Sequence, residues 1–343
     1  MQLPGVQLPG VLVPSLLAIP VALGTNAATT LAESPLVLVL TGLLLLLGLI
    51  SIIFITGGSH CQDPLFCVFV LLSFTSVVDL VISLEEDGFI SGFVEFYIRE
   101  GEPHLRTAHG IMICYWDGIV HYGLYLTMIV AIGQRKSYRN LGLFWLGSLV
   151  MSITVFLLGN LIGKYSSELS PALLLNLPYI LIPLWAGGRL FQQPKTPPSF
   201  SPEKVVLDCP ADSCFEYIYQ REPYLRDPVA YPKVQMLIYL FYILPFFCLG
   251  IYGLVLPGCS WLPDWSLVVA GAVAQAQFSH LGSSLHPRTP FPYQTPEDVW
   301  WSFLITNLLY ALGPQLLAYR CLHCPAFFLP SPPATLLPSK KHQ

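Results

Sequence analysis

The chain has 343 residues, of which 54% are hydrophobic and only 10% are charged, whereas a soluble domain usually carries about 25% charged residues. Its 16 Lys and Arg against 20 Asp and Glu leave a formal net charge of −4, and the basic patch that a nucleic-acid-binding surface needs is missing. The composition therefore excludes a soluble nucleic-acid-binding domain and indicates an integral membrane protein.

Eight stretches are long and apolar enough to cross a bilayer, because a helical crossing needs about 20 mostly apolar residues. A ninth, 10–28, is interrupted by Pro14 and Pro20, and since the first basic residue of the chain is Arg99 it lacks the basic start of a secretory signal. We favour a membrane helix there over a cleaved signal. The sequence thus predicts an all-α polytopic membrane protein with these eight spans: 35–56, 65–83, 110–132, 141–163, 171–191, 234–256, 266–283 and 299–322.

The chain also repeats itself. "YIREGEPHLR" (97–106) aligns with "YIYQREPYLR" (217–226), and further on "NLPYILIPLWAGGRLF" (176–191) aligns with "NLLYALGPQLLAYRCL" (307–322). Two matches in the same order indicate a tandem duplication. The identical loop residues that mark it are Glu102 and Glu222, Pro103 and Pro223, and Arg106 and Arg226.

This duplication predicts two tandem helical bundles, in which residues 61–191 form the first copy and residues 208–326 the second. The remaining parts are N-terminal membrane helices over 1–60, a proline-rich linker over 192–207, and a tail over 327–343.

The second copy lacks its first helix. In its place stands "FQQPKTPPSFSPEKV" (191–205), which is proline-rich and polar and cannot span a membrane. The loop 133–140 carries three basic residues and is expected in the cytosol, which places the acidic loop 84–109 in the lumen. With one more crossing both acidic loops face the lumen and the C-terminus is cytosolic; without it, the C-terminus is lumenal or the second copy is inverted. We expect a shortened form of a ten-crossing design.

The C-terminus offers a targeting signal. Lys340 and Lys341 stand at the positions of a dilysine signal, which retrieves membrane proteins to the endoplasmic reticulum and is read only in the cytosol. The alternative is a plain basic tail.

The cysteines leave two alternatives open. Cys209 and Cys214 flank an acidic loop and form a disulfide if that loop is lumenal, or remain two free thiols. Cys321 and Cys324 have C-x-x-C spacing but supply only two of the four ligands of a structural zinc site. The sequence therefore predicts neither a metal nor a cofactor.

Two acidic residues, Asp79 and Asp117, lie well inside predicted spans. An aspartate at mid-bilayer costs about 2.5–3.5 kcal/mol, so it needs a partner or a function. Asp117 and His121 are four residues apart and share a helix face, and Asp79 on the preceding helix can join them. The trio is interpreted as a general acid/base centre, a ligand-binding site or an interhelical hydrogen-bond cluster. Span 266–283 offers a second candidate, for which plain packing is the stronger interpretation: Gln275, Gln277 and His280.

Several long stretches resemble the transmembrane six superfamily: "FTSVVDLVISLEED", "EFYIREGEPHLRTAHG", "CYWDGIVHY", "GNLIGKYSSE", "YLRDPVAYPKVQML" and "PGCSWLPDW". The similarity covers nearly the whole chain. It departs at "PKTPPSFSPEKV", where relatives carry a further hydrophobic span. The family is built from two EXPERA modules, four-helix units shared with the emopamil-binding sterol isomerases and the sigma-2 receptor.

The resemblance implies a membrane protein of the endoplasmic reticulum, and of the compartment between it and the Golgi. Its implied role is to promote lipidation and secretion of triglyceride-rich lipoproteins and to limit lipid-droplet content, by binding a membrane lipid or sterol. The alternatives are a Δ8–Δ7 sterol isomerase and a scaffold that binds lipoprotein-assembly proteins through its lumenal acidic loops. No nucleic-acid partner is expected.

The isomerase alternative rests on an incomplete residue set. The related isomerases use a His and a Glu four residues apart on one helix and a Glu on the next. Here Asp79 stands at the position of the His, Ser83 at that of the first Glu, and Asp117 within one residue of the second. This departure favours lipid binding without catalysis.

Overall fold

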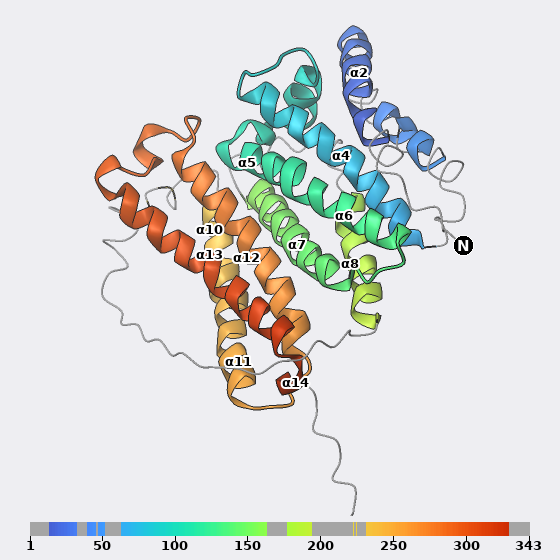
Figure 1. Ribbon diagram of the computed structural model, residues 1–343. Coiled ribbons are helices and arrows are strands. Elements are labelled where there is room, and N and C mark those ends of the chain that lie inside the picture. The colour runs from blue at the N-terminus through green and yellow to red at the C-terminus, as the bar shows by residue number, and fades with distance from the viewer. Residues whose placement is uncertain are drawn as a thin grey trace, which may run out of the picture.

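The computed structural model describes residues 14–32, 40–45, 47–51, 63–162, 177–193, 222, 224 and 231–328, and within these ranges all regular structure is helical. The α-helices are α2 (Ala18–Ala32), α4 (Pro64–Glu86), α5 (Ala108–Trp116), α6 (Tyr122–Gly133), α7 (Arg139–Ile162), α8 (Leu177–Gln192), α10 (Tyr231–Ile238), α11 (Leu244–Val255), α12 (Leu262–Leu285), α13 (Trp300–His323) and α14 (Pro325–Phe328). Figure 1 shows them as a bundle with α7 between α4 and α12. The predicted all-α class is confirmed.

Among the described residues six short segments connect or interrupt these helices. Three are π-helical: η2 (Tyr97–Gly101), η4 (Asp117–His121) and η8 (Tyr239–Ile243). The loops carry 3-10 turns that include η3 (Pro103–Arg106) and η9 (Phe291–Tyr293). Because η4 joins α5 to α6 and η8 joins α10 to α11, each of these pairs is one continuous helix with a π segment inside it.

Fewer helices are apolar enough to span a membrane than the sequence predicts. By length and hydropathy three described helices qualify, Pro64–Glu86, Arg139–Gly159 and Tyr231–Val255, and two shorter apolar helices cover Pro14–Ala27 and Leu40–Ser51. The other predicted spans coincide with α5–α6, α8, α12 and α13. The helix α12 has a lower hydropathy because it is buried along most of its length, and its buried side chains include Gln275, Gln277 and several serines.

The helices α7 and α12 occupy equivalent places in the two copies, and they pack directly on each other. A Cβ atom on Gly147 would lie 1.7 Å from the carbonyl oxygen of Val268, and a Cβ atom on Gly271 would lie 1.9 Å from that of Phe144. Both Gly147 to Gly271 and Phe144 to Val268 are shifts of 124 positions. The contact is therefore reciprocal, as in a two-fold symmetric dimer, and the copies meet across a pseudo-two-fold axis.

Neighbouring helices follow the same rule. The helix α5 of the first copy packs on α12, and α10 of the second copy packs on α7. Gly282 faces the side chain of Met112, and Gly159 faces the ring of Tyr231. In each copy the third helix, which is α7 or α12, therefore packs against the second helix of the other copy, which begins with α10 or α5, respectively.

The two copies run in the same direction. Arg139 at the start of α7 donates to Asp264 at the start of α12 over 2.6 Å, so both helices begin at one end of the bundle. We call this the basic-loop end, since the loop 134–138 lies there, and the opposite end the acidic-loop end. An inverted second copy, which the sequence left open, is not what the structure shows.

This parallel arrangement places the end of the first copy and the start of the second copy at opposite ends of the bundle. Gln193, which follows α8, donates to the Tyr138 hydroxyl at the basic-loop end over 3.0 Å, whereas Tyr231 packs against Gly159 near the other end of α7. The chain therefore passes from one end of the bundle to the other between residues 193 and 231. Most of that stretch, with the predicted linker, lies outside the described residues, and the domain boundaries stay a prediction.

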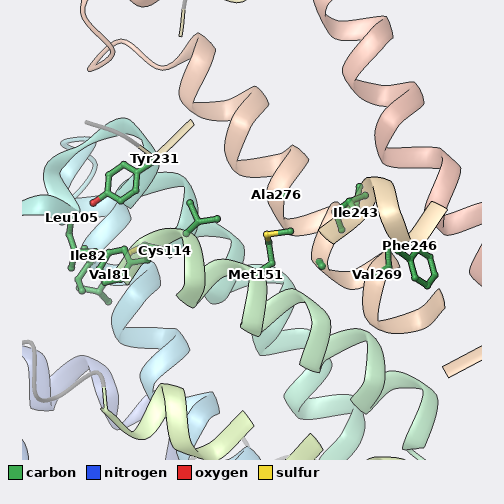
Figure 2. Packing of buried hydrophobic residues seen from close by; sticks show 14 of the residues in the cluster. Val81, Ile82, Leu105, Cys114, Met151, Tyr231, Ile243, Phe246, Val269 and Ala276 are labelled. Atoms are coloured by element: carbon green, nitrogen blue, oxygen red, sulfur yellow. The ribbon is translucent and has the colours of Figure 1, made fainter. Parts of the chain in front are cut away.

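A hydrophobic cluster joins the copies. Figure 2 shows Met151 of α7 and Ala276 of α12 between Ile82 and Cys114 of the first copy and Phe246 of the second. Burial of this apolar surface across the axis ties both bundles into one core.

The repeated loop motif seats each loop on the third helix of its own copy. The ring of His104 lies 4.8 Å from that of Phe156, and the ring of Tyr224 lies 5.7 Å from that of His280. Phe156 and His280 are again 124 positions apart. Within the motif Glu102 and Glu222 are buried, and Pro103 begins η3. Arg106 is exposed and pairs with Glu86 over 3.4 Å; Pro223 and Arg226 lie outside the described residues.

Replacing Gly147 by Ala should destabilise the protein by at least about 3 kcal/mol, since the new methyl group meets a backbone oxygen that cannot move aside. The measurement is thermal unfolding of the purified protein in detergent. Gly123→Ala is the matched control, because a Cβ atom there meets nothing within 4 Å. Equal unfolding midpoints for the two variants would contradict the reciprocal glycine contact.

Burial lowers the pKa of His104 to about 4 from an ordinary 6.5, so the folded protein favours the neutral ring. The unfolded chain binds more protons between these values, and stability should fall by up to about 1.4 kcal/mol per pH unit as the pH drops from 6.5 to 4. His104→Phe should flatten this slope in unfolding titrations. His323→Phe, at an exposed position, should retain it; a slope unchanged in His104→Phe would refute the assignment.

Candidate functional site

The predicted pair of Asp117 and His121 lies on the π segment η4, in the middle of the second helix of the first copy. Asp117 Oδ1 is 2.5 Å from His121 Nδ1, and Asp117 Oδ2 accepts a hydrogen bond from Ser76 Oγ on α4 over 2.8 Å. Both side chains are buried. Because π segments widen a helix by one residue and recur at functional sites, this pair is the natural starting point for the site.

The hydrogen bonds continue to α7. His121 Nε2 lies 2.8 Å from Ser148 Oγ, which also accepts from Trp116 Nε1 over 2.8 Å. Asp117, His121 and Ser148 thus have the order of a hydrolase triad. However, His121 and Ser148 have no exposed surface, so no substrate reaches the serine, and the chain of bonds fixes Asp117 in place. The sequence analysis missed Ser76 and Ser148, because a serine in a membrane helix commonly bonds its own backbone.

Asp79 completes the predicted trio. It lies on α4, one turn beyond Ser76, and lines the same cavity as Asp117. Asp79 is only partly buried, because it faces a cavity.

The cavity has a volume of about 320 Å³ and lies within the first copy. Three acidic side chains line it, Asp79, Asp117 and Glu102, and most of the remaining wall is apolar. Glu102 belongs to the repeated loop motif and accepts from the Tyr97 hydroxyl over 2.8 Å. The motif residue that marked the duplication is therefore a site residue as well, which sequence comparison alone did not reveal.

The polar groups gather toward one end of the cavity. Its wall on α4 runs from Leu71 to Ile82, a length of about 16 Å at 1.5 Å per residue. The acids and Tyr97 lie toward the acidic-loop end of this wall, and the rest of it is lined mainly by apolar side chains. The cavity thus suits an elongated molecule with one polar end.

An N-terminal helix outside the duplicated modules closes one side. The helix α2 contributes Ala22 and Asn26 to the wall. Asn26 Nδ2 donates to the Gly92 carbonyl over 2.9 Å, and Asn26 Oδ1 accepts from Phe96 N over 3.1 Å. This two-point bond anchors α2 to the loop that leads into η2 and hence to Tyr97.

The second copy has a different polar cluster. Glu222 Oε2 lies 3.0 Å from His280 Nε2, and Glu222 Oε1 accepts from Asn307 Nδ2 over 2.8 Å. Gln275 bonds Ser279, and Gln277 donates to the hydroxyl of Tyr239. The segment η8, equivalent to η4, contains no acidic residue. The second candidate set is thus used in interhelical and local hydrogen bonds.

The remaining residues singled out from the sequence are lysines and cysteines. Lys340, Lys341, Cys209 and Cys214 lie outside the described residues. Cys321 and Cys324 form no disulfide, and among the described residues no group of three potential metal ligands occurs.

The carboxylates of the acidic loop are engaged in bonds within the loop and to neighbouring segments. Glu85 accepts from the backbone N–H groups of Gly92, Phe93 and Val94 over 2.9–3.0 Å. Asp87 accepts from the Tyr115 hydroxyl and lies 3.0 Å from His286 Nε2. Glu86 pairs with Arg106 and, across the copies, with Arg288. These groups order the loop, which leaves few of them to bind a partner.

Comparison with known proteins covers nearly the whole chain. Residues 17–201 match the family model "Transmembrane 6 superfamily member 2-like, transmembrane domain", and residues 211–321 match the EXPERA domain. Transmembrane 6 superfamily member 2 of mouse is 56% identical over 350 residues, with 92% of each chain covered, and that of human is 53% identical over 363, with 96% of each covered. No solved structure matches.

The length of the human alignment bears on the expected missing span. It is 363 positions long, although this chain has only 343 residues. The human protein therefore has residues at at least 20 positions where this chain has none. A missing crossing requires an insertion of about that size, and its location between 191 and 234 stays a prediction.

Replacing His121 by Leu should destabilise the protein by about 1–3 kcal/mol, because it leaves buried polar atoms of Asp117 and Ser148 without their partner. Thr127→Ala, on the exposed face of α6, should change stability by less than about 0.5 kcal/mol. The measurement is thermal unfolding in detergent. Similar losses in both variants would show that the bond network does not hold the site.

Proposed function

Because this chain belongs to the transmembrane 6 superfamily member 2 family and carries its EXPERA domain, we propose that it binds a lipid or sterol in the first-copy cavity. The observation that carries this proposal is the cavity itself, whose mostly apolar wall follows α4 for about 16 Å and has acidic side chains toward one end. A volume near 320 Å³ falls in the range of ligand pockets that enclose small molecules.

The chemistry of the acidic end favours a ligand with a hydrogen-bond donor. Asp117 accepts bonds from Ser76 and is engaged by His121, so the polar atom most available to a ligand is on Asp79. A hydroxyl or another small polar head beside Asp79 would leave the apolar body of the ligand against Leu71, Leu72 and Ile182. A sterol or a lipid with one short polar head fits this description.

The cellular role follows from this binding activity. We place the protein in the endoplasmic reticulum and the adjoining intermediate compartment, where it promotes lipidation and secretion of triglyceride-rich lipoproteins and limits lipid-droplet content. The support is the family, the multi-pass membrane fold, and a chain end, Lys340 and Lys341, of the dilysine type. Lipoprotein-assembly proteins are the expected partners.

One observation favours sterol isomerisation as a second candidate. Asp79 and Asp117 both line the mostly apolar cavity, and a carboxyl group that holds a proton in such a cavity is suited to protonating a double bond. Against it, His121 is sealed behind Asp117 and Ser83 donates to its own backbone. Lipid binding needs neither group.

Filling the cavity should abolish binding without unfolding the protein. Val78→Trp projects a large ring into the cavity and should lower crosslinking of a photoreactive sterol at least tenfold, and Asp79→Leu should lower it severalfold. Val150→Trp, on the exposed face of α7, is the control. Equal labelling of Val78→Trp and Val150→Trp would refute the cavity as the binding site.

The same proteins separate binding from catalysis. Expressed in cells without their own Δ8–Δ7 isomerase and fed a Δ8-sterol, the parent chain should give no Δ7 product by mass spectrometry. Product from the parent but not from Asp117→Asn would establish the isomerase instead.

A further inference from the structure

The helix formed by α10, η8 and α11 is much less buried than the two other long apolar helices, α4 and α7. Only 28% of its most apolar window is buried, against 67% for α4 and 61% for α7. In η8 and α11 its buried side is a narrow stripe, Ile243, Phe246, Gly250 and Gly253. Outside this stripe η8 and α11 present large exposed apolar side chains.

The first copy shows what covers the same face. There the equivalent helix, α5 with η4 and α6, packs along its length on α4. The approach is closest at Gly118, where a Cβ atom would lie 2.9 Å from the Leu80 Cα. Farther along, the ring of Tyr125 lies 6.1 Å from that of Phe69. The face is thus built to receive one transmembrane helix.

The equivalence of the two helices rests on three features. Both follow the repeated loop motif, both carry a π segment after their first eight or nine residues, and both pack on the third helix of the other copy. The shift between the π segments is 122 positions. By this shift Ile129, which is fully buried, corresponds to Ile251, which is 64% exposed.

No described helix of the second copy takes the place of α4. The helices α10 and α11 pack chiefly on α7, on α12 and on η8. Gly118 corresponds to Leu240, which is 51% exposed, so an occupant would lie farther out than α4 does and would meet it with small side chains. Since residues 236–255 contain no charged residue, the contact surface of the occupant is apolar.

We propose that the exposed side of Tyr231–Val255 binds one apolar transmembrane helix of a partner membrane protein, in the position that α4 holds in the first copy. The partner helix is about 20 residues long, carries no charge in its middle part, and turns small side chains toward Leu240 and Ile251. Docking completes the second copy as a four-helix unit.

The test uses the full chain in phosphatidylcholine vesicles with a photocrosslinking amino acid at position 251. The probe is a synthetic helix with the sequence of residues 63–87, which already covers the equivalent face, but with Asp79→Leu and Leu80→Ala, so that its middle part is uncharged and the side chain opposite Leu240 is small. The matched control places the crosslinker at Phe241, which is 73% exposed; its counterpart Ile119 is 59% exposed although α4 is present. Position 241 therefore faces lipid in either case. A helix of scrambled sequence controls for composition.

We expect at least tenfold more adduct between the probe helix and position 251 than position 241, and little with the scrambled helix. Adducts with lipid alone, in equal yield at both positions, would overturn the proposal and make the face lipid-exposed. Adducts of position 251 with a second copy of the chain would also overturn it, in favour of a dimer. Neither result depends on whether the cavity binds sterol.

Discussion

The backbone contact between α7 and α12 is the constraint on which the rest of the molecule depends. Lipid tails are as apolar as leucine, so membrane helices associate through close packing rather than through the hydrophobic effect. Gly147 and Gly271 permit that closeness reciprocally. With the two third helices fixed, α5 and α10 cross to the opposite copy, and the loops of both copies meet at one end. The direction of the second copy is a consequence of this one crossing.

The two copies share an architecture but not a chemistry. In the first, Asp79, Asp117 and Glu102 surround a cavity, and buried hydrogen bonds behind Asp117 hold it rigid. In the second, the glutamate of the same motif, Glu222, is held between His280 and Asn307. The first copy therefore offers a cavity that a ligand can enter, whereas the second copy supports the first through helix packing. This division is why the proposed function rests on the first copy alone.

Much of this was predictable from the sequence. The helical class follows from hydropathy, and the spacing of Asp117 and His121 predicted a contact between these side chains that the structure contains. The network behind it was not predictable, because Ser148 becomes a partner only through the packing of α7. Nor was the wall formed by α2, since Asn26 meets Gly92 and Phe96 across 66 and 70 residues. Hydropathy also misjudged α12, whose polar side chains face protein.

The π segments η4 and η8 have a consequence beyond the acids that one of them carries. An extra residue in a turn rotates all later side chains by about 100° about the helix axis. In the first copy α5, before the segment, packs on α12 of the opposite copy as well as on α4, whereas α6, after it, packs on α4 and α7 of its own copy. The second copy keeps this rotation although its segment reads Tyr-Leu-Phe-Tyr-Ile. The π segment that carries Asp117 thus connects two parts of the helix with different packing partners. The site therefore lies on a backbone irregularity that both copies share.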